Sequence, residues 1–403
     1  MKKLVFLLIF VCLSLSVFAE NFFSKNRFLE VKIGADAGIS NNLFSANEFM
    51  KKELVIDLRK LAEECPDTGI SILANASPSL EMNLNIKSLS LGFSTGVDFF
   101  QRMDINKSLI DFLGFGNNIG QPLIAEIKEN AEIFTYVQAN VGFNFKKFRL
   151  HVKPTVFIPV LTINNSGGSV VFTNEADGTM KIHSDLNMAV YTTLDLTMKD
   201  GKIAVNTAAL ENTLYAGYGF DLAGSLSFPF TETFCIGADA RVPIIPGRLN
   251  KKYSITSSFA FESTILEIGN KEFQFADPKV DRGIEEEVWI NRPIKFFAYV
   301  DTKLFGKLIE LNAGAGFGIR KPFTEASLFY MEYQLGATLN LFSILKVGLF
   351  TQYMDQVFAH GLGMTVNVRF VQLDVGATVQ SASFKKSFVG AGAGAYAYVT
   401  VGF

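Results

Sequence analysis

The stretch "LIELNAGAGFGIR", residues 308–320, alternates between apolar side chains and polar or very small ones. Successive side chains of a β-strand point to opposite faces, so Ile309 and Phe317 share one face while Glu310 and Arg320 share the other. The same two-residue period returns in "SLEMNLNI" (79–86), "LSLGFSTGVDF" (89–99), "FRLHVKPTV" (148–156), "SLFYMEYQLGATLNL" (327–341), "LGMTVNVRF" (362–370) and "VQLDVGATVQ" (371–380). The sequence therefore predicts strands with one apolar and one polar face.

The start of the chain is the one long apolar run. In "MKKLVFLLIFVCLSLSVFAE", residues 1–20, two lysines precede an apolar segment, and Val17 and Ala19 are small enough for cleavage before Glu20. This pattern predicts a secretory signal peptide over 1–19 and a mature chain over 20–403. Export leaves Cys65 and Cys235, whose pairing stays open.

The composition narrows the class of protein. Of the 403 residues, 49% are hydrophobic and 19% charged, and the formal net charge is −2. A basic surface for nucleic acid is not indicated. An exported, hydrophobic chain without membrane helices can cross a bilayer only as a closed barrel. Lipid offers no hydrogen-bond partners, so every backbone N–H and C=O group must be paired within the protein. A soluble sandwich also alternates, but its outer face is polar.

We therefore predict an all-β fold, a transmembrane antiparallel up-and-down β-barrel of about 14 strands. Sixteen strands is the alternative, because "YSITSSFAFESTILEI" (residues 253–268) also alternates; we prefer a hairpin outside the membrane there. Very short links alternate with long ones along the chain, as in outer-membrane barrels. The long links at 40–78, 101–131, 159–213 and 244–288 are predicted to be extracellular extensions.

The ending "AYAYVTVGF", residues 395–403, carries a resemblance. Its alternating strand with Tyr398 and Val401, closing on Phe403, resembles the C-terminal insertion signal of bacterial outer-membrane barrels. The resemblance implies the outer membrane of a diderm bacterium, its lipids, the barrel-assembly machinery and periplasmic chaperones as partners. The overall plan is similar to the long-chain fatty-acid-transporter-like (FadL-like) barrels, although the N-terminal "NPA" motif of that group is missing here. No ligand-binding residue is carried over.

The polar strand faces supply the candidate channel lining. The lumen-facing candidates are Arg149, His151, Lys153, Asp239, Arg241, Asp301, Lys303, Glu310, Arg320, Glu332, Arg369 and Asp374. The same parity adds Glu30, Lys32, Asp36, Glu81, Asp98, Asp221, Lys295 and Lys346. Opposed charges either create a transverse field in a water-filled pore or pair across a narrow lumen and fill it. Both interpretations stay open here, and Arg149, His151 and Lys153 are a candidate anion ladder.

Two helices are predicted within the long links. Residues 47–66 have an N-cap in Asn47 and a stop in Pro66. The apolar side of this first helix is a candidate plug or portal and contains Met50, Leu54, Leu58 and Leu61. A shorter helix is predicted over 105–114, after Asp104.

A β-ribbon is predicted over 159–213. Asp200–Gly201 is a strong hairpin signal, and the residues 165–168, "NSGG", indicate a second turn.

The sequence contains no motif typical of a catalytic site or a metal site. His151, His183 and His360 are scattered, and no nucleophile elbow is present. We expect no enzyme activity, no cofactor and no metal. The expected function is a passive, porin-like channel or transporter for small or lipophilic solutes. The alternative is a non-conducting adhesin or scaffold that uses the β-ribbon.

Overall fold

The structure is a computed structural model. It describes residues 27–44, 57–116, 118–199, 202–205, 217–264, 274–275, 279–281, 283–341, 344–368, 370–389 and 392–403. The predicted signal peptide lies outside these residues, as do Asn47, Met50, Leu54 and Arg369.

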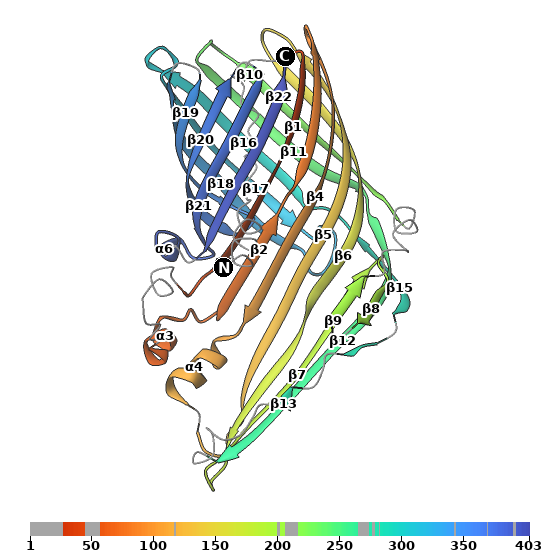
Figure 1. Ribbon diagram of the computed structural model, residues 1–403, viewed down its shortest axis with the longest axis vertical. Coiled ribbons are helices and arrows are strands. Elements are labelled where there is room, and N and C mark those ends of the chain that lie inside the picture. Colours follow the sequence, from red (N-terminus) through yellow and green to blue (C-terminus); the bar gives the residue numbers. More distant parts are fainter. Residues whose placement is uncertain are drawn as a thin grey trace.

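Fifteen strands form a closed antiparallel wall (Figure 1). They are β1 (Leu29–Asn41), β2 (Ile70–Ala76), β3 (Ser79–Ile86), β4 (Leu89–Ile105), β5 (Leu123–Asn144), β6 (Arg149–Asn174), β10 (Gly219–Pro229), β11 (Phe234–Ile245), β16 (Ile294–Leu304), β17 (Ile309–Arg320), β18 (Leu328–Leu341), β19 (Leu345–Met354), β20 (Val357–Val368), β21 (Val371–Ser381) and β22 (Ala393–Gly402). Each pairs with the next in this order, except that β2 and β3 both pair with β1 on one side and β4 on the other, and β22 returns to β1 with Val401 opposite Val31. The predicted all-β barrel is confirmed.

The barrel has sixteen strands, which was the alternative count, and not the preferred count of about fourteen. Within the described residues the closed circuit has fourteen positions, because β2 and β3 follow one another between β1 and β4 and share one position. Two more long strands, β7 (Thr179–Thr192) and β12 (Gly247–Thr264), continue the sheet from β6, which makes sixteen.

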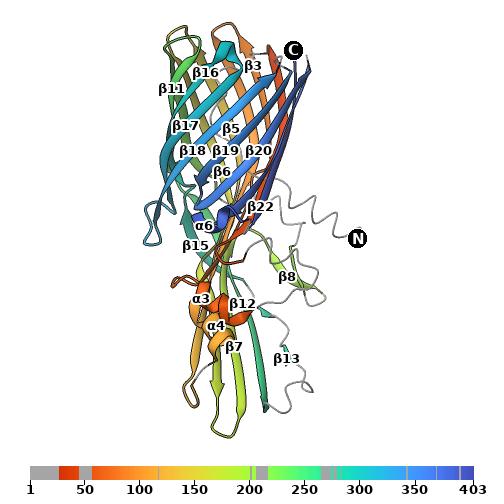
Figure 2. The same cartoon turned by 90° about the vertical axis from the view of Figure 1, so that its left-hand side faces the viewer.

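An extension of the wall projects from one end of the barrel (Figures 1 and 2). The distal halves of β5 and β6 pair with each other, and β6, β7 and β12 continue this sheet. The short strands beside it are β13 (Gln274–Phe275), β14 (Lys279–Val280) and β15 (Ile284–Ile290). β13 pairs antiparallel with Phe259–Ala260 of β12, within the extension.

Two turns were predicted for the β-ribbon over residues 159–213. The structure lacks the first of them and contains the hairpin predicted at the second. Asn165–Gly168 forms no turn: β6 runs through it, with a register shift between Ile163 and Gly167. Pairing on both sides outweighs the local turn preference, and glycine suits the site because a Cβ on Gly167 would stand 2.0 Å from the Ile127 carbonyl oxygen. The strands β8 (Leu196–Lys199) and β9 (Lys202–Val205) pair as the predicted hairpin, whose two central residues lie outside the described part.

Both predicted helices are present, with corrected limits. α3 (Leu58–Glu64) begins after Asp57, whose side chain accepts from the Lys60 amide, and it ends just before Cys65 and Pro66. α4 (Lys107–Phe115) begins two residues later than predicted. Ile105 is still a strand residue, because it pairs with both Ile70 and Ile127.

The two shorter helices lie at opposite ends of the barrel. η2 (Phe305–Lys307) forms the β16–β17 turn, and α6 (Phe384–Ser387) lies between β21 and β22. No helix among the described residues is long and apolar enough to cross a bilayer.

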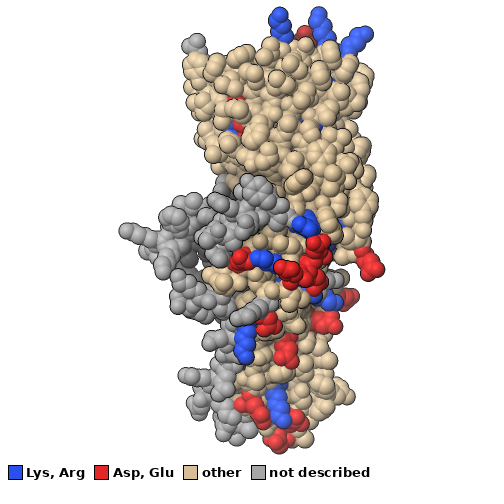
Figure 3. Space-filling model, turned by 90° about the vertical axis from the view of Figure 1, so that its right-hand side faces the viewer, with Lys and Arg blue, Asp and Glu red and all other residues tan. Residues whose placement is uncertain are grey.

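The outer surface of the barrel is apolar. Figure 3 shows a belt almost free of charge, with Lys or Arg side chains at the short-turn end and mixed charges over the extension. Exposed aromatic residues border the belt at both ends, as interfacial girdles do. They are Phe143, Phe145, Phe230 and Phe305 at the short turns, and Trp289, Phe323, Phe329, Phe384 and Phe388 at the other end.

Candidate functional site: a layer of ion pairs across the lumen

Strand alternation directs the predicted lining residues inward. On β6 the side chains of Arg149, His151 and Lys153 share the inner face, whereas Val152 and Val156 are exposed outside. On β22 Tyr398 points inward and lies under the Lys32 ammonium at 4.5 Å. Its neighbours Val401 and Phe403 are exposed on the outer face.

Arg320 and Lys295 form the centre of a charged cluster inside the barrel. The Arg320 guanidinium donates to Glu132 Oε2 and to Asp355 Oδ1, both at 2.8 Å. Lys295 Nζ donates to Asp355 Oδ2 at 2.8 Å and to Glu332 Oε1 at 3.1 Å. Glu332 is only 2% exposed, so this charge is compensated by its partner and not by water.

Arg292, in the link between β15 and β16, forms a second centre. Its guanidinium donates to Asp98 Oδ2 at 2.7 Å and to Asp221 Oδ2 at 2.8 Å. The Tyr136 ring lies beneath it at 4.7 Å. Arg241 Nη1 adds a longer contact to Asp98 at 3.9 Å.

These contacts cross the lumen. Glu132 is on β5 and Arg320 at the end of β17, and β6, β10, β11 and β16 lie between these strands in the wall. We call the set the ion-pair layer; it consists of Asp98, Glu132, Asp221, Arg241, Arg292, Lys295, Arg320, Glu332 and Asp355. A cavity of about 70 Å³ remains among them, which is large enough for a few water molecules.

Other predicted lining residues lie outside the layer. Glu310 binds Lys303 at 3.4 Å and Lys346 at 3.0 Å, near the short-turn end. Asp374 accepts from Thr365 and Gln372 on its own part of the wall. The structure thus brings Arg241, Arg320 and Glu332 together. It leaves Arg149, His151, Lys153, Asp239, Asp301, Lys303, Glu310 and Asp374 along the wall.

Sequence reasoning missed three members of the layer. Arg292 and Asp355 lie in links, where parity gives no direction. Glu132 directly follows the predicted extension 101–131 and was not among the inward candidates, although continuing the alternation of β5 backward from Gln138 would have put it on the inner face. Link residues that fold into a lumen leave no periodic signal.

The helix proposed as a plug or portal contributes to a separate cluster. Leu61 packs with Cys65, Ile70 and Ile110 beside the extension, while Leu58 is exposed. Burial raises the pKa of the Cys65 thiol, and both Cys65 and Cys235 are free thiols. Among the described residues no group of His, Cys, Asp or Glu side chains is arranged to hold a metal.

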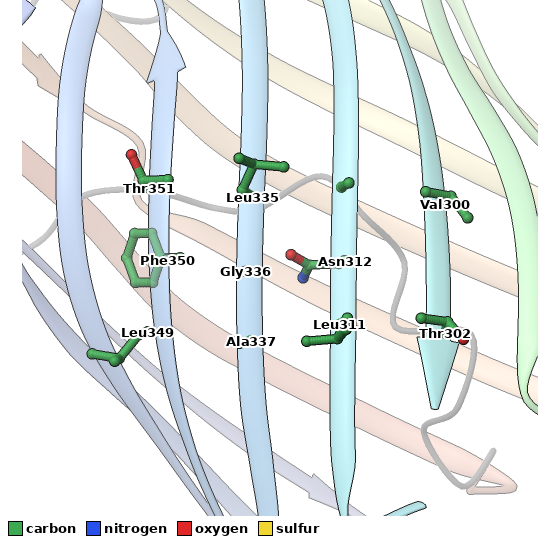
Figure 4. A pocket seen from close by; sticks show the side chains of 11 residues that line it. Val300, Thr302, Leu311, Asn312, Leu335, Gly336, Ala337, Leu349, Phe350 and Thr351 are labelled. Atoms are coloured by element: carbon green, nitrogen blue, oxygen red, sulfur yellow. The ribbon is translucent and has the colours of Figure 1, made fainter. Parts of the chain in front are cut away.

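A shallow apolar hollow of about 630 Å³ lies on the wall formed by β16 to β19 (Figure 4). Its lining includes Leu311, Leu335 and Leu349, and Leu349 is 64% exposed on the outer face. This hollow is part of the apolar outer belt and lies on the opposite side of the wall from the ion-pair layer.

Comparisons with known proteins give only distant similarities. No family model and no curated protein matches the chain. The toluene transporter TbuX of Ralstonia pickettii aligns with a TM-score of 0.46 at 8% identity, over 94% of this chain and 90% of that one. The toluene transporter TodX of P. putida gives 0.46 and 8%, over 94% and 91%. The translocator domain of NalP from Neisseria meningitidis gives 0.32 and 8%, over 100% and 95%. Similarities this distant assign neither a family nor a function.

Proposed function

We propose that this chain is an outer-membrane barrel that transports small lipophilic solutes, and that the ion-pair layer closes its lumen at rest. The observation that carries the proposal is a charged layer inside a closed barrel with an apolar outer belt. Apolar packing closes a space at least as stably as buried ion pairs do. Ion pairs, however, can exchange their partners for water, so a barrier made of them can open.

Apolar surface next to the layer supports a lipophilic solute. Phe99, Phe100 and Phe134 line the same cavity as the layer, and the Phe100 ring lies 3.6 Å from the Arg320 guanidinium. Phe134 also packs on Phe157, in a cluster that continues to Leu249 and Ile290 at the base of the extension. A solute arriving along the extension would therefore meet aromatic side chains before it meets the charges.

The orientation in the membrane is part of the proposal. Short turns face the periplasm in barrels of this kind, and long connections face outward. We place the extension outside the cell and the belt in outer-membrane lipid. We also propose that the signal peptide directs export, and that periplasmic chaperones and the barrel-assembly machinery take part in biogenesis. The adhesin alternative receives no support from the comparisons.

Uptake of labelled toluene by intact cells tests the function, since toluene is small and apolar. The chain is expressed in a porin-deficient diderm host, and its folding is checked by heat-modifiable gel migration. We expect uptake several-fold faster than in cells carrying the empty vector. Equal uptake with folded protein in the outer membrane would refute the proposed transport.

A further inference from the structure

The two-residue turn between β19 and β20 reaches into the lumen. We infer that this turn, Asp355–Gln356, is the movable part of the closure, and that Asp355 decides whether the lumen is open. The inference rests on the proposed function, since it names the gate of the same site.

The backbone of the turn is a tight two-residue hairpin connection. Met354 pairs with Val357, so Asp355 and Gln356 alone connect the strands. Both have positive φ, 47° and 69°, as the favoured two-residue hairpin turn requires. Asp tolerates this region, whereas Gln has no such preference, so the contacts around Gln356 help to hold the turn in place.

The contacts that hold the turn come from the rest of the wall. Asp355 accepts from Lys295, Arg320 and the Tyr330 hydroxyl, the last at 2.9 Å. Gln356 accepts from Arg102 on β4, which belongs to the opposite part of the circuit. The tip of one hairpin therefore ties β4, β16, β17 and β18 together across the lumen.

The turn can move away from the lumen without leaving the cations that it contacts unpaired. Lys295 keeps Glu332 as a partner, and Arg320 keeps Glu132. Arg102 keeps Asp104, to which its Nε donates at 2.8 Å. Because each cation has a second carboxylate, opening costs far less than leaving a buried charge unpaired.

The other acids of the layer are poorly suited to move. Asp98, Glu132, Asp221 and Glu332 project from β4, β5, β10 and β18, which are hydrogen-bonded to neighbours on both sides. Displacing one of them would break part of the wall. A hairpin tip breaks only its own contacts, so the turn is the part of the layer that can swing.

Single-channel recording in a planar bilayer tests the gate. The variant Asp355→Asn keeps the size of the side chain and removes the charge that Lys295 and Arg320 bind. We expect its open probability to rise about tenfold over that of the parent chain. Glu232→Gln is the matched control: it also replaces a turn carboxylate by an amide, but an exposed one at the opposite end of the barrel, and it should leave the open probability unchanged.

A second variant keeps the inference falsifiable if Asp355→Asn fails to fold. Gln356→Ala removes the contact with Arg102 and retains the carboxylate of Asp355, so a smaller rise is expected. Folding of each variant is verified by heat-modifiable migration. An open probability equal to that of Glu232→Gln, in whichever variant folds, would overturn the gate.

The recordings and the toluene uptake assay separate the two proposals. Uptake by the parent chain without any change in the turn variants would refute the gate and leave the transport function standing. Raised open probability without toluene uptake, in parent or variants, would support the gate and refute the function.

Discussion

Arg320 is a residue on which several contacts of the layer converge. It pairs with Glu132 and Asp355 and stacks on Phe100, and only 8% of it is exposed. Removing it leaves two carboxylates without this partner in a poorly hydrated site. Arg320→Met should therefore lower the free energy of unfolding by about 3–5 kcal/mol.

Urea unfolding followed by the fluorescence of Trp289, the single tryptophan, measures this loss. Arg59→Met on α3 is the matched control, since the side chain of Arg59 is 75% exposed and its loss should cost under about 0.5 kcal/mol. Equal stabilities of the two variants would contradict a stabilising role for the layer.

At the scale of elements, α4 is attached to the extension by an aromatic contact. Phe112 stacks on Phe172 of β6 with 4.1 Å between ring centroids, over a cluster that includes Val170 and Ala125. Phe112→Ala should release α4 and make its chain sensitive to limited proteolysis, while the barrel keeps its heat-modifiable migration. Phe115→Ala, on the exposed side of the same helix, should leave the cleavage rate unchanged. Similar cleavage of both variants would argue against this attachment.

The contact between α3 and α6 should depend on pH. Lys386 Nζ donates to Glu64 at 2.7 Å, and this hydrogen bond holds the pKa of the carboxyl below its ordinary value of 4.5. Since the folded pKa is the lower one, the contact stabilises above pH 4.5 and is lost as the pH falls through the folded value.

Spin labels at Arg59 and Lys385 report on this contact. Their distance distribution should be narrow near neutral pH and broaden in acid. In Glu64→Gln it should be broad at both pH values. A distribution that stays narrow in acid would show that other contacts hold α3.

At the scale of the whole molecule, the outer belt predicts how the barrel meets lipid. Leu349 lies on the exposed face of β19 in the middle of the belt. If acyl chains cover it, Leu349→Arg should destabilise the folded barrel in bilayers by about 2–4 kcal/mol. Phe305→Arg, at the short-turn rim, should cost no more than about 1 kcal/mol. Unfolding in lipid vesicles compares the two, and equal costs would place the belt outside a bilayer.

Alternation alone determined most of the architecture. The two-residue period is a property of the local chain, so the strands, the apolar outer face and the inward direction of Arg241, Arg320 and Glu332 could all be predicted from it. Turn and cap signals located the β8–β9 hairpin and the core of α3. They were wrong at Asn165–Gly168 and at the start of α4, where pairing with neighbouring strands overrode the local preference.

Only the tertiary structure decided which inward charges meet. Parity gives the face of a residue but neither its height in the barrel nor its opposite neighbour, because both depend on how the circuit closes and how its strands are staggered. Arg320 therefore reaches Glu132, 188 positions away in the chain. Asp355 enters the same layer from a turn, which has no period to read. The sequence determines a barrel with an apolar outer face and a charged interior, and the closure of the wall brings some of those charges together as ion pairs across the lumen.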